Sequence, residues 1–198
     1  MPSPQLLLAS QSPRRAELLR QLGLRIVVAP ADVAEGAHDG EAPARYAQRI
    51  ALEKARAGWA ASDGALPVLG ADTDVVLDGR ILGKPKDRAD ALAMLAALSD
   101  REHEVYSAVA VVRGEQEGLA LSVTRVAFGV ITPAQAAAYW ASGEPADKAG
   151  AYGIQGLGAQ FVRGIRGSYS GVVGLPLYET TTLLKQFGIE TLVFVSPS

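Results

Sequence analysis

Short apolar runs and amphipathic stretches follow one another along most of this chain. The apolar runs predict strands over residues 6–9, 27–29, 67–71, 105–112, 119–130 and 191–195. Stretches with apolar residues at helical spacing predict helices over residues 13–22, 43–60, 87–98, 133–142 and 175–187. Asp78-Gly79, between two apolar runs, predicts a tight hairpin turn. Because strands and helices mix without strict alternation, the pattern predicts an α/β fold with a mixed, twisted sheet and flanking helices.

Composition narrows the class of protein. No linker or repeat interrupts the 198 residues, so residues 1–198 are expected to form a single domain. The formal net charge of −2 argues against broad nucleic-acid binding, which needs a basic face. With no cysteine and two histidines, any metal is expected to be a hard cation held by oxygen ligands. No apolar run approaches the ~20 residues of a membrane helix, and no signal peptide is evident, so a cytoplasmic location is expected.

The start of the first predicted helix carries charge of an unexpected sign. Ser12 fits the N-cap and Pro13 the first helical position, so Arg14 and Arg15 fall in the first turn. The positive end of the helix dipole favours acidic residues there. Two cations at this place indicate an anion site that uses the free N–H groups of the helix. The alternative is a pair of surface arginines that bind nearby acids such as Glu17.

Three further charged positions stand out against their surroundings. Lys54 falls inside the apolar stripe of the helix over residues 43–60, where it needs an anionic partner or extends its ammonium to solvent. Asp72 and Asp74 follow a buried strand; if the strand continues, both point one way, Thr73 points the other way, and the two acids could hold Mg²⁺. A turn at these residues is the alternative. Lys84, between Gly83 and Pro85, is extended and open to a ligand.

Residues 144–174 are rich in glycine and give few helical signals. Four glycines within residues 150–158 favour backbone that approaches a ligand or turns sharply, and Gln155 among them could read the edge of a base. The alternative is a surface loop with tight turns. His103 is expected to be a polar residue at the start of a strand. The chain has no Gly-x-Ser-x-Gly elbow and no cysteine, which excludes those nucleophiles.

Taken together, these segments resemble the Maf family of nucleoside triphosphate pyrophosphatases over nearly the whole chain. The matching blocks, in chain order, are Leu8-Ala9-Ser10-Gln11-Ser12-Pro13-Arg14-Arg15, Lys54-Ala55, Gly70-Ala71-Asp72-Thr73, Leu82-Gly83-Lys84-Pro85, Asp147 to Gly156, Gly167-Ser168-Tyr169 and Val173-Gly174-Leu175-Pro176. The resemblance implies hydrolysis between the α and β phosphates, with a divalent metal, Mg²⁺ or Mn²⁺. It also implies a mixed-sheet fold with two lobes around a central cleft, similar to inosine-triphosphate pyrophosphatase.

Residue by residue, the resemblance implies roles for most of the positions described above. Asp72 matches the catalytic base, and Asp72 with Glu35 matches the acids that hold the metal. The positions that match substrate-binding residues are Ser10, Ser12, Arg14, Arg15, Lys54 and Lys84.

The pair Asp72-Thr73, with Arg15 and Gln155, resembles the branch that acts on dTTP and UTP, so Arg15, Thr73 and Gln155 are the expected specificity residues. The expected role is clearance of non-canonical pyrimidine nucleotides. Two alternatives stay open: a 7-methyl-GTP pyrophosphatase, and a nucleotide-sensing regulator of cell division without turnover. The resemblance also implies a homodimer, while the net charge and the short apolar runs lead us to expect no nucleic-acid or membrane partner.

Overall fold

One mixed sheet runs through the whole of the computed structural model, which describes residues 3–191. Its strand order is β2-β1-β3-β5-β6-β7, and β4 pairs with the far end of β3. β1 lies parallel to β2 and β3, whereas the remaining pairs are antiparallel. The strands are β1 (Leu6–Leu8), β2 (Ile26–Val28), β3 (Val68–Leu77), β4 (Arg80–Leu82), β5 (Glu102–Arg113), β6 (Gln116–Phe128) and β7 (Val162–Arg166). The predicted mixed sheet is confirmed.

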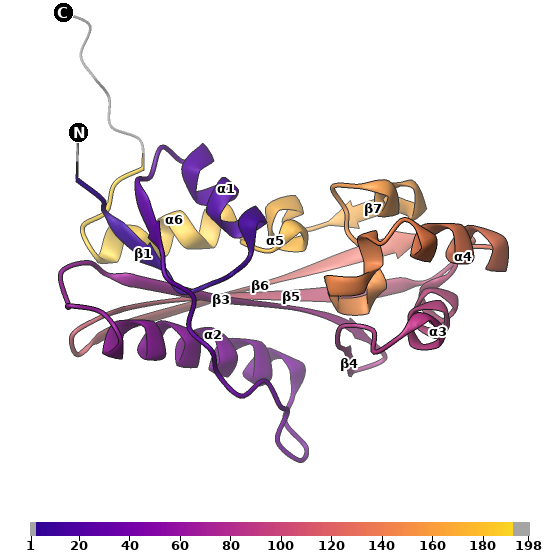
Figure 1. Ribbon diagram of the computed structural model, residues 1–198, viewed down its shortest axis with the longest axis horizontal. Helices are drawn as coiled ribbons and strands as arrows, with labels where there is room; N and C mark the ends of the chain where they lie inside the picture. The colour runs from indigo at the N-terminus through magenta and orange to yellow at the C-terminus, as the bar shows by residue number, and fades with distance from the viewer. Residues whose placement is uncertain (1–2, 192–198) are drawn as a thin grey trace, which may run out of the picture.

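Helices cover both faces of this sheet (Figure 1). α1 (Pro13–Gln21), α5 (Tyr169–Val173) and α6 (Leu177–Gln186) lie on one face, and α2 (Pro43–Ala60) lies on the other. α3 (Arg88–Leu98) and α4 (Pro133–Ala141) pack together at the end of the sheet that carries β4 and β7. No helix within residues 3–191 has the length and apolar character needed to cross a bilayer.

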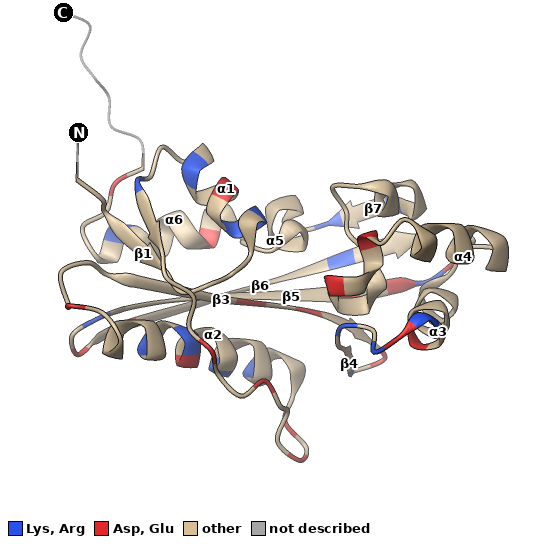
Figure 2. Cartoon of the chain, in the orientation of Figure 1, with Lys and Arg blue, Asp and Glu red and all other residues tan. Residues whose placement is uncertain are grey.

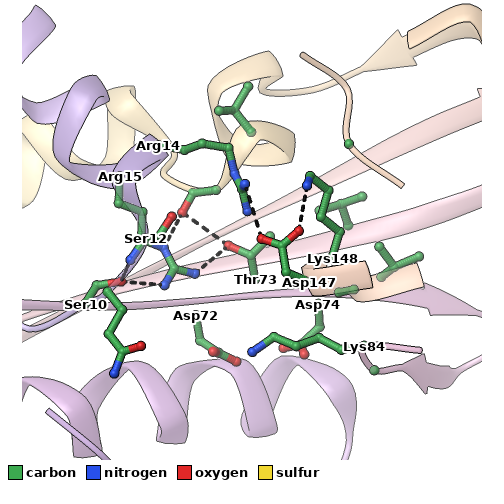
Figure 3. Close-up of a pocket in the computed structure, with 18 of the residues that line it drawn as sticks. Ser10, Ser12, Arg14, Arg15, Asp72, Thr73, Asp74, Lys84, Asp147 and Lys148 are labelled. Atoms are coloured by element: carbon green, nitrogen blue, oxygen red, sulfur yellow. Dashed lines mark hydrogen bonds and ion pairs between the residues drawn. The ribbon is translucent and has the colours of Figure 1, made fainter. Parts of the chain in front are cut away.

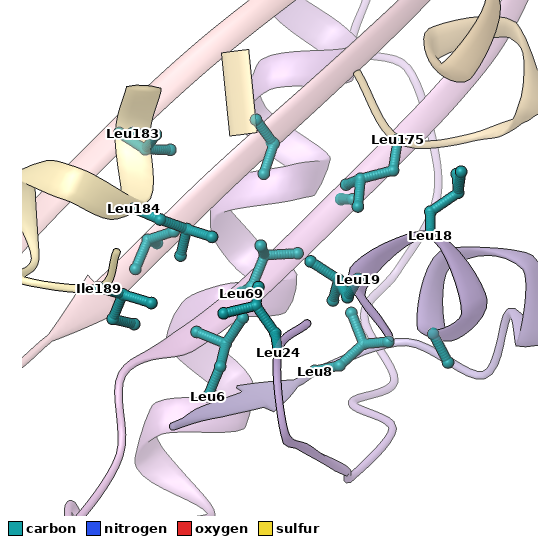
Figure 4. Packing of buried hydrophobic residues seen from close by; sticks show 14 of the residues in the cluster. Leu6, Leu8, Leu18, Leu19, Leu24, Leu69, Leu175, Leu183, Leu184 and Ile189 are labelled. Carbon is teal, nitrogen blue, oxygen red and sulfur yellow. The ribbon is translucent and has the colours of Figure 1, made fainter. Parts of the chain in front are cut away.

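Separate hydrophobic clusters at the two ends of the long strands give the molecule two lobes. Figure 4 shows the first, in which leucines of β1, β3, α1 and α6 pack together on one face of the sheet. The second cluster joins α3 and α4 to the other end of β3, β5 and β6. Because β3, β5 and β6 pass through both clusters, the lobes share one rigid sheet, and a cleft lies between them.

Helix α2 approaches the sheet closely because small residues face each other. A side chain at Gly70 of β3 would collide with the backbone of Ala51 and Ala55 of α2. A Cβ at Gly58 would lie 2.9 Å from the side chains of Ala9 and Val68. This tight contact brings Lys54, on the same side of α2, against the strand at Asp72.

Most predicted elements are confirmed within a few residues. The helix over residues 43–60 has the predicted bounds, and the Asp78-Gly79 turn joins β3 to β4 with positive φ at both residues. β3 continues through residues 72–77, beyond the predicted end at residue 71. Residues 144–174 form three 3₁₀ helices, β7 and α5, none of which was predicted. The 3₁₀ helices are η1 (Glu144–Asp147), η2 (Ala149–Ala151) and η3 (Leu157–Phe161). From residue 192 on, the strand predicted over residues 191–195 lies outside the described residues.

Candidate functional site

A cleft of about 1050 Å³ opens where one edge of β3 lies uncovered. On that edge β1 pairs with β3 only at Val68 and Leu69, and β4 pairs with it only from Val75 onward. Within residues 3–191, no strand covers this edge between Gly70 and Asp74. In Figure 2, basic residues lie at the start of α1 and after β4, with acidic residues on β3 between them. The cleft therefore has a strand edge as its floor and charged walls.

Strand alternation sends neighbouring residues of β3 to opposite faces of the sheet, as predicted for a continuing strand. Thr73 of β3 pairs with Ser107 of β5, and their hydroxyl oxygens lie 3.2 Å apart. Asp72 and Asp74 point to the α2 face, where both are buried. The turn considered as an alternative at residues 72–74 is excluded, because these residues lie within β3.

Arg15 reaches the cleft from the first turn of α1 and binds only neutral acceptors (Figure 3). Its guanidinium donates to Ser10 Oγ at 3.1 Å, to Thr73 Oγ1 at 3.2 Å and to the Gly174 carbonyl at 2.9 Å. Burial lowers the pKa of Arg15, although the nearby Asp72 carboxylate opposes that shift. Gly174 has φ +138°, a conformation that favours glycine, so this carbonyl depends on the glycine. The result is a partly buried cation with no ion-pair partner among the described residues.

The neighbouring residues of α1 build the same wall. Ser12 is the N-cap and Pro13 the first helical residue, as predicted, but the Ser12 side chain makes no capping bond. Instead the Ser12 N–H donates to Ser10 Oγ at 3.2 Å. Arg14 does not pair with Glu17; its Nη1 lies 3.8 Å from Asp147 Oδ2 across the cleft (Figure 3). At that distance and exposure the contact is weak, and an anionic ligand could replace it.

On the opposite face, Lys54 binds two carboxylates. Its Nζ lies 2.8 Å from Asp72 Oδ1 and 2.6 Å from Glu35 Oε1. Burial of Glu35 opposes ionisation, but the hydrogen bond from Lys54 and the positive charges of Lys54, Lys84 and Arg15 together outweigh it and lower the pKa of Glu35. The anionic partner expected for Lys54 is therefore present, and the alternative with its ammonium in solvent is wrong, since Lys54 is buried. The structure brings Glu35, Lys54 and Asp72 together, and the roles expected for them at a phosphate and a metal stay predictions.

Asp74 lies beside Asp72 and is the least satisfied group of the site. Its side chain is buried, and its Oδ2 contacts no hydrogen-bond donor among the described residues. Burial, together with the charge of Asp72, raises the pKa of Asp74 to about 8. Lys84 is exposed in the loop after β4, and Figure 3 shows its ammonium pointing toward the two aspartates. No ion pair with Lys84 is formed among the described residues.

The glycine-rich wall is fixed by a carboxylate that the sequence analysis missed. Glu144 accepts hydrogen bonds from the Leu157 N–H at 2.7 Å, the Gly158 N–H at 3.1 Å and the Tyr139 hydroxyl at 2.6 Å. The Tyr139 hydroxyl in turn accepts from the Gly153 N–H. A side chain at Gly156 would collide with Glu144, so glycine is needed there for space. Gln155, exposed in the middle of this loop, is among the residues that line the cleft.

Two other residues differ from the sequence analysis. Lys148 binds Asp147 and the Glu144 carbonyl at 2.7 Å each and lines the cleft, although it was not predicted as a site residue. His103 is 2% exposed in the second hydrophobic cluster, where its Nε2 lies 2.8 Å from the Tyr152 hydroxyl. His103 does lie at the start of a strand, β5, as expected, and the structure adds that it is buried there. The partner of His103 lies 49 positions away, so spacing gave no sign of that contact, whereas Lys148 binds residues one and four positions before it.

The acids of the cleft fit a divalent cation only in part. The buried, unpartnered Asp74 Oδ2 beside Asp72 offers the oxygen ligands that Mg²⁺ and Mn²⁺ prefer. Within the described residues, no group of three or more His, Cys, Asp or Glu is placed to hold a metal ion. Mg²⁺ commonly binds one or two carboxylates and completes its shell with phosphate oxygens and water. The donor set therefore fits a cation that arrives with a phosphate ligand.

Comparisons with known proteins agree with the resemblance found in the sequence. The family model described as Maf-like protein matches residues 5–187. A dTTP/UTP pyrophosphatase of Saccharophagus degradans is 53% identical over 98% of this chain and 94% of its own length. One of Bordetella avium, with the same name, is 53% identical over 94% of this chain and 96% of its own. A solved dITP/XTP pyrophosphatase from Mycobacterium abscessus covers 92% of this chain and 94% of its own, with 21% identity and a TM-score of 0.45.

Proposed function

This chain belongs to the Maf family, and we propose that it hydrolyses dTTP and UTP to the nucleoside monophosphate and pyrophosphate. One observation carries the proposal: the side chains of Arg14, Arg15, Lys54 and Lys84 all line the cleft that holds Asp72. A triphosphate with about four negative charges needs this many cations to bind in a partly dry cleft. Relatives about half identical over nearly the full chain, all named dTTP/UTP pyrophosphatase, support the same reaction.

The cations and the start of α1 bind the triphosphate chain. The helix begins at Pro13 and its first turn lines the cleft, so N–H groups of that turn can donate to phosphate oxygens. Ser10 and Ser12 extend this wall, and Arg14 exchanges its weak contact with Asp147 for a phosphate. Lys84, which has no ion-pair partner among residues 3–191, neutralises the charge of the leaving pyrophosphate.

Asp72 activates the attacking water. Lys54 holds its carboxylate at the open edge of β3, from which it can orient a water in line with the bond to be broken. The water oxygen bonds to the α phosphorus, its proton passes to Asp72, and the bond from that phosphorus to the bridging oxygen breaks. A divalent cation, Mg²⁺ or Mn²⁺, bound by Asp72 and Glu35, would offset phosphate charge and lower the pKa of a bound water.

We assign base selection to Arg15, Thr73 and Gln155, which line the same cleft. Arg15 and Thr73 are joined by a hydrogen bond of 3.2 Å, so they present a fixed pattern of donors and acceptors. Gln155 lies on the glycine-rich wall, where its amide can pair with the donor and acceptor edge of a pyrimidine. Clearance of non-canonical pyrimidine nucleotides is the role this selectivity would serve. The homodimer implied by the resemblance and the cytoplasmic location expected from the sequence stay predictions.

Product analysis over a nucleotide panel tests the proposal. The purified protein is incubated with Mg²⁺, and separately with Mn²⁺, and with dTTP, UTP, dATP, GTP or 7-methyl-GTP. Monophosphate and pyrophosphate released mainly from dTTP and UTP are the expected products. Release mainly from 7-methyl-GTP would keep the reaction and overturn the specificity assigned to Thr73 and Gln155. No turnover of any nucleotide would contradict the proposed reaction and favour a nucleotide-sensing role.

A further inference from the structure

Asp74 is a buried carboxyl group that the proposed reaction does not use. It follows Asp72 by two residues on β3, so strand alternation places the two carboxyl groups side by side on one face. Asp74 is 7% exposed, and its Oδ2 has no hydrogen-bond partner within residues 3–191. Figure 3 shows both carboxyl groups on the side of the strand that Lys84 approaches. A buried polar atom with no partner is costly unless a ligand completes it.

The cations nearby do not balance the acids around Asp74. Lys54 is the one ammonium bound within this group, and its contacts go to Glu35 at 2.6 Å and Asp72 at 2.8 Å. Arg15 donates to Ser10, Thr73 and Gly174 rather than to an acid. Three carboxyl groups, Glu35, Asp72 and Asp74, thus share one bound lysine. The shortage of positive charge lies at Asp74, because the other two acids already bind Lys54.

We propose that Asp74 is a direct ligand of the divalent cation, which it shares with Asp72 at the open edge of β3. Adjacent carboxylates of this kind offer hard oxygen donors, which suit Mg²⁺ or Mn²⁺. Asp74 joins Asp72 and Glu35, the acids named above, and phosphate oxygens of the nucleotide complete the coordination, since no group of three or more His, Cys, Asp or Glu among the described residues is placed to hold a metal ion by itself. The inference rests on the proposed function for the identity of the nucleotide, whereas the binding of metal is measured without turnover.

Manganese binding to Asp74→Asn tests this assignment. Free Mn²⁺ is measured by electron paramagnetic resonance during titration of the protein mixed with a non-hydrolysable α,β-methylene analogue of dTTP. Loss of the Asp74 carboxylate is expected to weaken Mn²⁺ binding at least about tenfold. Glu53→Gln is the matched control, because Glu53 lies on α2 and pairs with Arg49 away from this group; it is expected to bind Mn²⁺ as the wild type does. Equal Mn²⁺ affinity in Asp74→Asn and wild type would overturn the proposal.

Metal-free stability separates a ligand from a structural residue. Asp74→Asn replaces a buried carboxyl group that lacks a hydrogen-bond partner at Oδ2 with an amide of the same size, so its thermal midpoint without metal is expected to equal or exceed that of the wild type. Added Mn²⁺ with the analogue is expected to raise the midpoint of the wild type more than that of the variant. A variant that melts well below the wild type without metal would show that the carboxyl serves packing, and would contradict the proposal. Asp74→Ser repeats the comparison if the asparagine variant fails to fold.

The nucleotide panel distinguishes failure of the metal assignment from failure of the proposed function. Hydrolysis of dTTP by the wild type, with Mn²⁺ affinity unchanged in Asp74→Asn, would leave the proposed function standing and refute the metal assignment. Mn²⁺ affinity lost in Asp74→Asn, with no nucleotide hydrolysed by the wild type, would support the metal assignment and refute the proposed function.

Discussion

The two faces of β3 treat buried charge in opposite ways. On the face of Thr73, the Arg15 guanidinium is surrounded by a serine hydroxyl, a threonine hydroxyl and a backbone carbonyl, all neutral. On the face of Asp72, two buried aspartates and Glu35 lie around a single lysine. One face therefore holds a cation without an anion, and the other holds more anions than cations. Both faces meet at the uncovered edge of β3, which forms the floor of the cleft.

This contrast shows how one strand can serve a substrate and its metal together. Because side chains alternate along a strand, Asp72 and Asp74 lie on one face of β3 and Thr73 lies on the other, with no change in the backbone. The cationic face suits the oxygens of an anionic nucleotide, and the acidic face suits a hard cation. Neither face is balanced alone, and a metal–triphosphate complex lying across the strand edge would balance both.

Removal of the Asp72 charge is the strongest test of the acidic face. Asp72→Asn is expected to lower kcat for dTTP by at least ~10², because general-base loss has effects of this size, with the fold kept. Steady-state kinetics measure the change, and far-ultraviolet circular dichroism checks the fold. Near-normal turnover in this variant would contradict both the assignment of Asp72 and the contrast between the two faces.

His103 tests whether the Thr73 face also disfavours charge away from the cleft. His103 lies on β5, on the same face of the sheet as Ser107, the residue that pairs with Thr73. Its Nε2 contacts the neutral Tyr152 hydroxyl. Burial lowers the pKa of His103 from 6.5 to about 4, so protonation favours the unfolded chain. Its contribution to stability is complete above pH 6.5 and declines as the pH falls toward 4, by about 3 kcal/mol in total.

Denaturant titrations of wild type and His103→Leu between pH 7 and pH 4 measure this contribution. The wild type is expected to lose more stability over the range than the leucine variant, since other acid-sensitive groups act equally in both. A wild-type profile parallel to that of the variant would show that His103 keeps an ordinary pKa.

Arg15→Lys probes the cationic face with the charge retained. Lysine cannot reproduce the fork that reaches Ser10, Thr73 and the Gly174 carbonyl at once. We expect kcat/KM for dTTP to fall about tenfold, the size of one lost hydrogen bond to a charged group. Arg20→Lys, on the exposed side of α1, is the matched control and is expected to act as the wild type. Equal effects of the two substitutions would remove the special role of this face.

Local sequence was enough to predict most of this arrangement. Ser12-Pro13 determined where α1 begins, and strand alternation placed Asp72 and Thr73 on opposite faces. Lys54 stood out because a charge in an apolar stripe needs a partner, and Asp72 is that partner. These features depend on neighbours within a few residues, so short-range rules describe them.

The glycine-rich segment could not be predicted in the same way. Its 3₁₀ helices and β7 depend on contacts with distant segments, such as the pairing of Arg166 with Arg125 on β6. The Gly174 carbonyl reaches Arg15 across 159 positions of the chain. Local propensity holds no information on such partners, and glycine itself allows many conformations.

Glu144→Gln tests whether this segment is a third, independently fixed wall of the cleft. The amide keeps the size of the side chain but replaces charged hydrogen bonds to the Leu157 and Gly158 N–H groups with neutral ones. We expect a few-fold loss in kcat/KM for dTTP and a smaller preference for dTTP over dATP, because Gln155 lies in the loop that Glu144 holds. Competition between the two nucleotides measures the preference, and Glu115→Gln, in the exposed turn between β5 and β6, is the control. If the preference stayed unchanged while kcat/KM fell, Glu144 would stabilise the fold without orienting Gln155, and selectivity would depend on the two faces of β3 alone.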